Sequence, residues 1–376
     1  MPVVVLFIIF VLLLVIAVPV SITLGITSVL PSICDPSFTV GAKYLIRAMF
    51  GGLDSFPLLA VPMFVLSGII MAKGGISKKL FDVFAYFLGK FTAGMPCAVI
   101  VTCLFYGAIS GSAPATVAAV GSMTIPILTN LGYDLTFSTA IVAVAGGLGV
   151  IIPPSIPFIM YGMASGASVS DLFLAGIVPG LMIGALLMIY AIYHCKRYGE
   201  DKAKIHAEVQ ELHDKGLLKV LKESFFALLS PVIILGCIYS GVASPTEAAV
   251  ISVFYALIIS LFVYKSIHIR DIWGILVEAI RTFTPILFIL AASTAFSRVL
   301  TLMQVPQTVS EFILNNFHSP VAILLIINLF LLIVGMVMDT TPAILILTPI
   351  LLPIVQAIGM DPVSYTHLRA HETGAY

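Results

Sequence analysis

The stretch Gly107-Ala-Ile-Ser-Gly-Ser-Ala-Pro-Ala-Thr116 lies in the middle of an uncharged run of 43 residues, from Phe91 to Tyr133. A straight helix of that length would be ~64 Å long, about twice the ~30 Å thickness of a bilayer's hydrocarbon core. The run must therefore turn back or contain two spans. Glycine and proline interrupt helices, and serine and threonine hydroxyls can satisfy the backbone groups that are released. These residues predict the tip of a re-entrant helical hairpin near 95–130.

The composition of the whole chain is that of a membrane protein. Of its 376 residues, 60% are hydrophobic and 10% are charged, against about 45–50% and about 25% in soluble domains. The uncharged runs predict an all-α polytopic membrane protein with roughly ten spans. The 18 basic and 18 acidic residues leave no positive excess for nucleic acid, and no GxxxxGK[ST] loop is present for ATP.

A second break is predicted in the uncharged run 135–170, which contains Pro153-Pro154-Ser155-Ile156-Pro157. Three prolines in five residues are incompatible with a regular helix. We therefore expect a broken span at this place.

The one strongly polar stretch, 196–223, holds seven Lys and Arg and six Asp and Glu residues. Ile205, Val209 and Leu212 recur within it at helical spacing, which indicates a surface helix. Its seven basic residues predict that it is a cytoplasmic linker.

The two sides of this linker repeat. Shifted by 227 residues, Pro126 falls on Pro353, Gly132 on Gly359 and Asp134 on Asp361. We expect two inverted repeats: residues 1–195, and residues 224–362 with a second hairpin near 325–357. Residues 363–376 are polar and aperiodic and are expected to be a non-native tail, with the second repeat incomplete.

Asp339 is an ionisable residue between two uncharged runs, which by default suggests a function. One interpretation is that it coordinates an ion at the second hairpin tip. The alternative is a structural role, in which Thr341 caps a helix that begins at Pro342 and Asp339 bonds the loop.

The first tip offers oxygens at Ser110, Gly111, Ser112 and Thr116. Hard cations such as Na⁺ prefer oxygen ligands, and the positive N-termini of half-helices favour an anionic substrate. The alternative is helix packing through small residues. Asp339 in the matching position favours the ion site.

Five segments in order resemble the large permease subunit of TRAP (tripartite ATP-independent periplasmic) transporters, the DctM-like family. They are GLDSFPLLAVPMFVLSG (51–68), GAISGSAPATVAAVGSMTIP (107–126), GLGVIIPPSIPFIMYG (147–162), SGVASPTEAAV (240–250) and GMVMDTTPAILILTPILLPI (335–354). The resemblance covers essentially all of 1–362.

The resemblance implies an elevator-type, sodium-coupled importer in the bacterial inner membrane. It implies organic-acid substrates, such as C4-dicarboxylates or sialic acid. It also implies two partners, a small four-helix membrane subunit and a periplasmic substrate-binding protein. Na⁺ is the coupling ion, and no cofactor is expected. Ion contacts would also include Gly335 and Thr341, and substrate contacts would include Pro154, Ser155 and Pro342.

The sequence alone leaves other functions open. A stand-alone secondary anion transporter or channel would need no binding protein. An intramembrane enzyme is a weaker alternative, because no histidine lies in the middle of an uncharged run to serve as a base.

Overall fold

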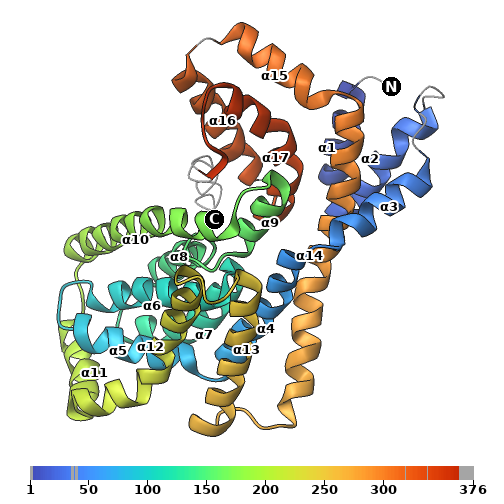
Figure 1. The fold of residues 1–376 in the computed structure, drawn as a ribbon. Coiled ribbons are helices and arrows are strands. Elements are labelled where there is room, and N and C mark those ends of the chain that lie inside the picture. The colour runs from blue at the N-terminus through green and yellow to red at the C-terminus, as the bar shows by residue number, and fades with distance from the viewer. Residues whose placement is uncertain (1–2, 35–37, 39–40, 318, 337, 364–376) are drawn as a thin grey trace. The chain divides into compact units, whose positions relative to one another are not determined.

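The computed structural model describes residues 3–34, 38, 41–317, 319–336 and 338–363. Every regular element within them is helical, as predicted (Figure 1). The chain divides into two compact units. Unit 1 consists of residues 1–59, 159–168 and 280–375, and unit 2 consists of residues 60–158 and 169–279. Each unit takes segments from both sides of the linker, so the compact units differ from the predicted repeats. The expected tail lies, from residue 364 on, outside the described residues.

Unit 2 is built around α6 (Gly94–Ser110), of which fifteen of the 17 residues are buried. A helix that is apolar on all sides is stable only when other elements cover it. Neighbouring helices provide this cover: α4 (Ala60–Lys73), α5 (Ile76–Leu88), α7 (Ala113–Asn130), α8 (Leu135–Gly146), α10 (Val169–Tyr198) and α12 (Leu217–Tyr239). The remaining elements of the unit are η2 (Gly147–Val150), α11 (Lys202–Asp214), α13 (Pro245–Ile258) and a π-helical turn, η3 (Ile259–Val263).

Unit 1 contains the second predicted hairpin. Its α17 (Thr340–Ala357) packs against α15 (Val305–Asn316) and α16 (Pro320–Gly335). The Tyr161 hydroxyl donates to the Pro362 carbonyl at 2.8 Å, which ties segment 159–168 to the end of the described chain. The other elements of the unit are α1 (Val3–Val15), α2 (Val20–Cys34), α3 (Ala42–Leu53) and η1 (Phe56–Leu59). Two helices cross the boundaries between the units: α9 (Ile156–Ser165) and α14 (Asp271–Leu302).

Both predicted interruptions of the helices are present. α6 ends at Ser110, α7 begins at Ala113, and the two helices pack together, so the chain reverses within 107–116. The proline-rich break is wider than expected. Helix α8 ends at Gly146, and a 3₁₀ turn and an irregular segment follow before α9 begins at Ile156.

Helix boundaries recur at the offset of 227 residues. Shifted by this amount, α7 coincides at both ends with α17, and α5 and α6 fall within two residues of α15 and α16. One pair differs: α3, η1 and α4 correspond to the single helix α14. The first copy has Gly51, Gly52 and Pro57 where the second has Glu278, Ala279 and Thr284, and glycine and proline disfavour a continuous helix. The recurrence supports the predicted repeat, and its inverted topology stays a prediction.

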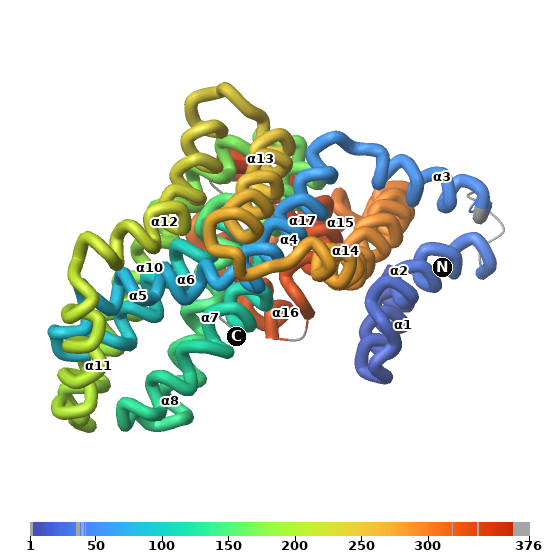
Figure 2. The backbone as a smooth tube through the Cα atoms, turned by 90° about the horizontal axis from the view of Figure 1, so that it is seen from below, coloured from blue at the N-terminus to red at the C-terminus, as the bar shows by residue number. Residues whose placement is uncertain are grey.

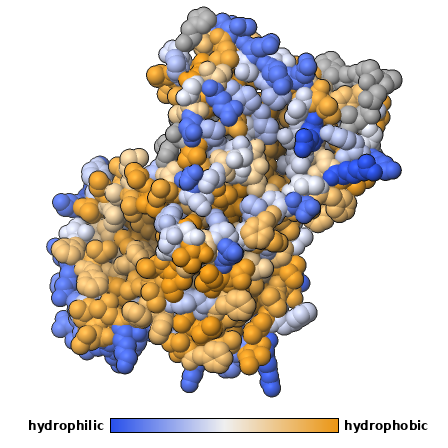
Figure 3. All heavy atoms as spheres, viewed as in Figure 1, coloured by the Kyte–Doolittle hydropathy of each residue, from blue (hydrophilic) through white to orange (hydrophobic). Residues whose placement is uncertain are grey.

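Six helical segments are long and apolar enough to cross a membrane: Phe56–Lys73, Val169–Tyr198, Leu217–Tyr239, Pro245–Val263, Asp271–Leu302 and Thr340–Ala357. Figure 3 shows an apolar surface over the helices of unit 2, with hydrophilic residues gathered at its margins. An apolar face of this extent is typical of a surface that meets lipid.

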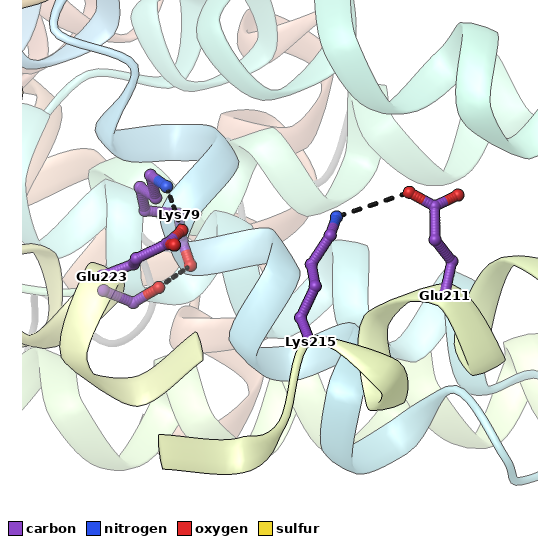
Figure 4. Close-up of polar contacts among 5 residues, drawn as sticks. Lys79, Glu211, Lys215 and Glu223 are labelled. Atoms are coloured by element: carbon purple, nitrogen blue, oxygen red, sulfur yellow. Dashed lines mark hydrogen bonds and ion pairs between the residues drawn. The ribbon is translucent and has the colours of Figure 1, made fainter. Parts of the chain in front are cut away.

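The polar linker contains the predicted surface helix, α11, in which Ile205, Val209 and Leu212 are buried. α11 lies beside α5 (Figures 1 and 2). Figure 4 shows two charged pairs of this region, one that joins it to α5 and one that lies within it. Lys79 binds Glu223 at 2.7 Å across two helices, and Lys215 binds Glu211 at 3.5 Å. Its cytoplasmic location stays a prediction.

Glu200, at the start of the linker, holds both ends of the first hairpin. Its Oε1 accepts the Ala93 N–H at 2.9 Å, just before α6, and the Tyr133 hydroxyl at 2.7 Å, just after α7. Burial and this hydrogen bond raise the pKa of Tyr133 above its usual range. One carboxylate oxygen therefore fixes the two legs of the hairpin at their base.

Replacement of Glu200 by alanine should destabilise unit 2. The substitution leaves the buried Tyr133 hydroxyl and the Ala93 N–H without their acceptor, and a hydrogen bond to a charged group contributes about 1.5–3 kcal/mol. We expect the melting temperature in detergent to fall by several degrees. Glu208→Ala is the control, because Glu208 is exposed on α11. An equal loss in both variants would contradict the role of Glu200.

Candidate functional site

The first helix break owes its shape to two residues with opposite backbone conformations. Gly111 has φ of 63°, in the left-handed region, and its N–H donates to the Gly107 carbonyl. Ser112 is extended (φ −139°, ψ 127°) and is the N-cap of α7. Glycine adopts the left-handed conformation without steric cost, so the chain reverses in two residues.

Three polar residues of the tip form a cluster. The Thr116 hydroxyl donates to the Ser112 carbonyl at 2.8 Å, and the Ser110 and Thr116 hydroxyl oxygens are 3.0 Å apart. Ser110 and Thr116 are buried. Of the oxygens predicted at this tip, the structure therefore brings together the Ser110 and Thr116 hydroxyls and the Ser112 carbonyl.

The proline-rich break packs directly on this tip. The Ile156 N–H donates to the Gly111 carbonyl at 3.1 Å. The buried Ser155 hydroxyl donates to the Val150 carbonyl at 2.5 Å and accepts the Phe158 N–H at 3.3 Å. Residues predicted separately as ion contacts and substrate contacts thus lie side by side in unit 2.

Close approach between the two breaks depends on glycine. A Cβ on Gly111 would lie 2.9 Å from the Pro154 carbonyl oxygen, and one on Gly107 would lie 2.5 Å from the Gly149 Cα. A Cβ on Gly149 would lie 2.4 Å from the Thr116 hydroxyl oxygen. Sequence reasoning missed Gly149, although its place just before the prolines is a signal that could have found it.

The second break places Asp339 at the position that corresponds to Ser112. Asp339 is the extended N-cap of α17, and its carbonyl accepts the Ala343 N–H at 3.3 Å. The expectation that Thr341 caps a helix beginning at Pro342 is wrong, because both residues lie inside the first turn and are buried. Proline is tolerated there, since the first N–H groups of a helix lack intrahelical partners.

The Asp339 carboxylate is exposed and makes no cap hydrogen bond to α17. Gly335, also predicted as an ion contact, is the buried last residue of α16. A carboxylate at a helix N-terminus is stabilised there by the helix dipole. The Asp339 carboxylate can therefore be stabilised at this position without a capping hydrogen bond.

The chemistry of the two tips suits a hard monovalent cation and an organic anion. Hydroxyl and carbonyl oxygens are gathered at the first tip, and a carboxylate stands at the second. Among the described residues no group of three or more His, Cys, Asp or Glu side chains lies together as a transition-metal site would require. Helix N-termini, as at α7, attract anions.

Comparisons with known proteins identify the family to which the chain belongs. The sequence profile of the family described as "Tripartite ATP-independent periplasmic transporter, DctM component" matches residues 7–368. The isethionate TRAP transporter permease protein DctMQ of Oleidesulfovibrio alaskensis is 42% identical over 97% of this chain and 56% of its own length. The C4-dicarboxylate TRAP transporter large permease protein DctM of Pseudomonas aeruginosa is 38% identical over 84% of this chain and 72% of its own length. The sialic acid TRAP transporter large permease protein SiaM of Vibrio cholerae is 34% identical over 87% of this chain and 75% of its own length.

Two solved transporter structures share the fold. The Alcanivorax borkumensis YdaH transporter matches with a TM-score of 0.61 at 12% identity, covering 98% of this chain and 87% of its own. The MtrF efflux pump of Neisseria gonorrhoeae matches with a TM-score of 0.61 at 14% identity, covering 97% of this chain and 83% of its own. The chain therefore belongs to the DctM-component family of tripartite ATP-independent periplasmic transporters, as a multi-pass permease subunit of the bacterial inner membrane rather than an enzyme.

Proposed function

We propose that the chain is the large membrane subunit of a sodium-coupled importer of small organic acids. The observation that carries the proposal is the pair of oxygen-bearing helix breaks at equivalent positions of the repeat. One break presents Ser110, Ser112 and Thr116, and the other presents Asp339. Helices broken in corresponding positions of two repeats are the sites at which secondary transporters hold coupling ions and substrates.

Na⁺ fits the first tip because the oxygens there have lone pairs to spare. The Thr116 hydroxyl donates its proton to the Ser112 carbonyl, so the lone pairs of its oxygen are available to the neighbouring Ser110 hydroxyl or to a cation that takes the place of that hydrogen bond. The carbonyl end of α6 adds negative potential beside it. A hydroxyl or carbonyl set of this kind suits a hard cation.

The substrate is proposed to be an organic acid of the C4-dicarboxylate or sialic-acid type. The relatives are named for isethionate, C4-dicarboxylate and sialic acid. Pro154 and Ser155 lie beside the first tip, and Pro342 lies in the first turn of α17. The N-terminus of α7 supplies N–H donors and positive potential for an anion.

The family description also supports the proposed partners, a periplasmic binding protein and a small four-helix membrane subunit. The elevator motion implied by the resemblance is part of the same proposal. A stand-alone anion transporter or channel is the alternative. Transport that is independent of any binding protein would favour it.

Uptake by the subunit together with its partners should depend on Na⁺. Labelled C4-dicarboxylate and labelled sialic acid would be offered to proteoliposomes in an inward Na⁺ gradient. Replacement of external Na⁺ by choline should abolish accumulation, because choline is too large for a tip built from hydroxyls and carbonyls. Equal accumulation in choline would refute sodium coupling.

Asp339→Asn should abolish or strongly impair uptake in a folded protein. Asparagine is as good an N-cap as aspartate, so a structural role predicts no loss. A cation site, by contrast, needs the charge, because Asp339 is the only formal charge between Glu311 and Asp361. The attraction between a carboxylate and a cation 4 Å apart is ~4 kcal/mol at an effective dielectric constant of 20, less the desolvation cost.

The matched control for Asp339→Asn is Asp361→Asn, since Asp361 is exposed and binds only the local Val363 N–H in the described chain. The measurements are sodium-dependent uptake and a thermal melt. Wild-type uptake by Asp339→Asn, with unchanged sodium dependence, would assign the residue to structure.

Gly149→Ala should raise the Na⁺ concentration needed for half-maximal uptake. The new methyl group collides with the Thr116 hydroxyl, and threonine has little freedom to rotate away. Gly236→Ala in α12 is the control, because no atom lies within 4 Å of a Cβ there. Adding Thr116→Ser to Gly149→Ala should restore part of the sodium affinity. An unchanged sodium dependence in Gly149→Ala would argue against an ion site at this tip.

A further inference from the structure

A groove in unit 2 is not explained by ion or organic-acid transport. It lies between α8 and α10 and has a volume of about 410 Å³. Its lining runs from polar to apolar, with Asp134 and His194 at one end and Ile141, Val144 and Leu187 beyond them. It is separate from the helix breaks described above.

The apolar part of the groove is formed by one stripe on each helix. On α8 the stripe contains Phe137, Ile141 and Val144, spaced for one helix face. On α10 the outer edge of the groove continues into exposed apolar residues, such as Leu186 (57% exposed) and Ile189 (62% exposed). Because α10 is long and apolar enough to span a membrane, this side of the groove opens towards the hydrocarbon of the bilayer.

The polar end is a negative charge framed by aromatic rings. Asp134 caps α8, and its Oδ2 accepts the Phe137 N–H at 3.0 Å, which holds the pKa of this carboxyl below its usual range. The His194 ring stacks on Phe137 with centroids 4.0 Å apart and an interplanar angle of 4°. The exposed Tyr190 also lines this end. Tyrosine gathers at the level of lipid headgroups.

The charged residues in and beside the groove indicate which class of ligand it could bind. Asp134 is the only Asp, Glu, Lys or Arg residue in the lining, so an organic anion or an anionic lipid has no counter-charge inside the groove. Lys196 and Arg197 follow at the end of α10. Along α10 the order is therefore apolar, acidic, basic, and a phospholipid whose ammonium lies beside its phosphate at the level of the headgroups, with its acyl chain towards the apolar stripe, would meet both the carboxylate and the basic pair.

We propose that this groove binds a phospholipid with a primary ammonium headgroup, of the phosphatidylethanolamine class. The ammonium donates to the Asp134 carboxylate, and one acyl chain lies along the stripes of α8 and α10. The volume of the groove is at the small end of ligand pockets, so the rest of the lipid lies on the exposed face of α10.

The test uses the full chain, purified and delipidated in detergent, with three short-chain probes. These are dihexanoyl phosphatidylethanolamine, phosphatidylcholine and phosphatidylglycerol. The ethanolamine lipid should raise the melting temperature most, because a quaternary choline has no N–H to donate and a glycerol headgroup is uncharged. Native mass spectrometry should show one retained ethanolamine lipid. Equal shifts with all three lipids, or a larger shift with phosphatidylglycerol, would overturn the proposal.

Variants separate the groove from general lipid effects. Asp134→Asn keeps the N-cap and removes the charge, and it should weaken ethanolamine-lipid binding up to about fivefold, the upper end of the scale of an exposed ion pair. Asp201→Asn is the matched control, because Asp201 is also an N-cap, of α11, and lies outside the groove. Ala140→Trp should fill the groove and abolish binding. Unchanged binding in Asp134→Asn and Ala140→Trp would show that the lipid binds elsewhere.

Discussion

The fold depends on one constraint: a helix that stops where water is excluded must find partners for the backbone groups it releases. At the first break the structure meets this demand almost entirely from within unit 2. The Gly111 N–H returns to Gly107, and its carbonyl accepts from Ile156. The Ser112 carbonyl takes the Thr116 hydroxyl. The first tip and the proline-rich break therefore satisfy each other's free backbone groups, which explains why they lie together.

The close contact between the first tip and the proline-rich break sets strict limits on side-chain size. The tip, η2 and the proline segment approach so closely that Gly107, Gly111 and Gly149 have no room for a Cβ. The same closeness brings the hydroxyls of Ser110 and Thr116 to 3.0 Å from each other. Packing through small residues and ion binding, considered as alternatives at the sequence level, are thus compatible at this tip. The small residues bring the oxygens together.

Local sequence signals predicted the local features well. The Gly-Ser-Pro composition of 107–116 predicted the chain reversal. The Ser-x-x-Glu pattern of Ser244 and Glu247, typical of a capping box, is likewise a local signal, and it forms that box at the start of α13. The apolar spacing of Ile205, Val209 and Leu212 predicted the buried face of α11. Each of these depends on residues within one or two helical turns.

Features that depend on distant contacts were not predictable in the same way. The division into two compact units arises from packing between segments far apart in sequence, such as 60–158 with 169–279. The role of Glu200 depends on bringing Ala93 and Tyr133 to one carboxylate. The N-cap of α17 was misplaced for a different reason. Proline fits any position in the first turn, so Pro342 does not determine where the helix begins.

The two tips are electrostatically unequal, although they occupy equivalent positions in the repeat. The N-cap of α7 is a neutral serine, so the positive end of that helix stays available to an anion. The N-cap of α17 is Asp339, whose charge opposes the positive end of its helix. An organic anion is therefore favoured beside the start of α7, next to the hydroxyl and carbonyl cluster proposed for Na⁺, and is disfavoured at the start of α17, where the Asp339 carboxylate attracts a cation. If both tips serve the proposed sodium-coupled transport, this single difference between Ser112 and Asp339 gives the two tips different affinities for the organic anion and for Na⁺.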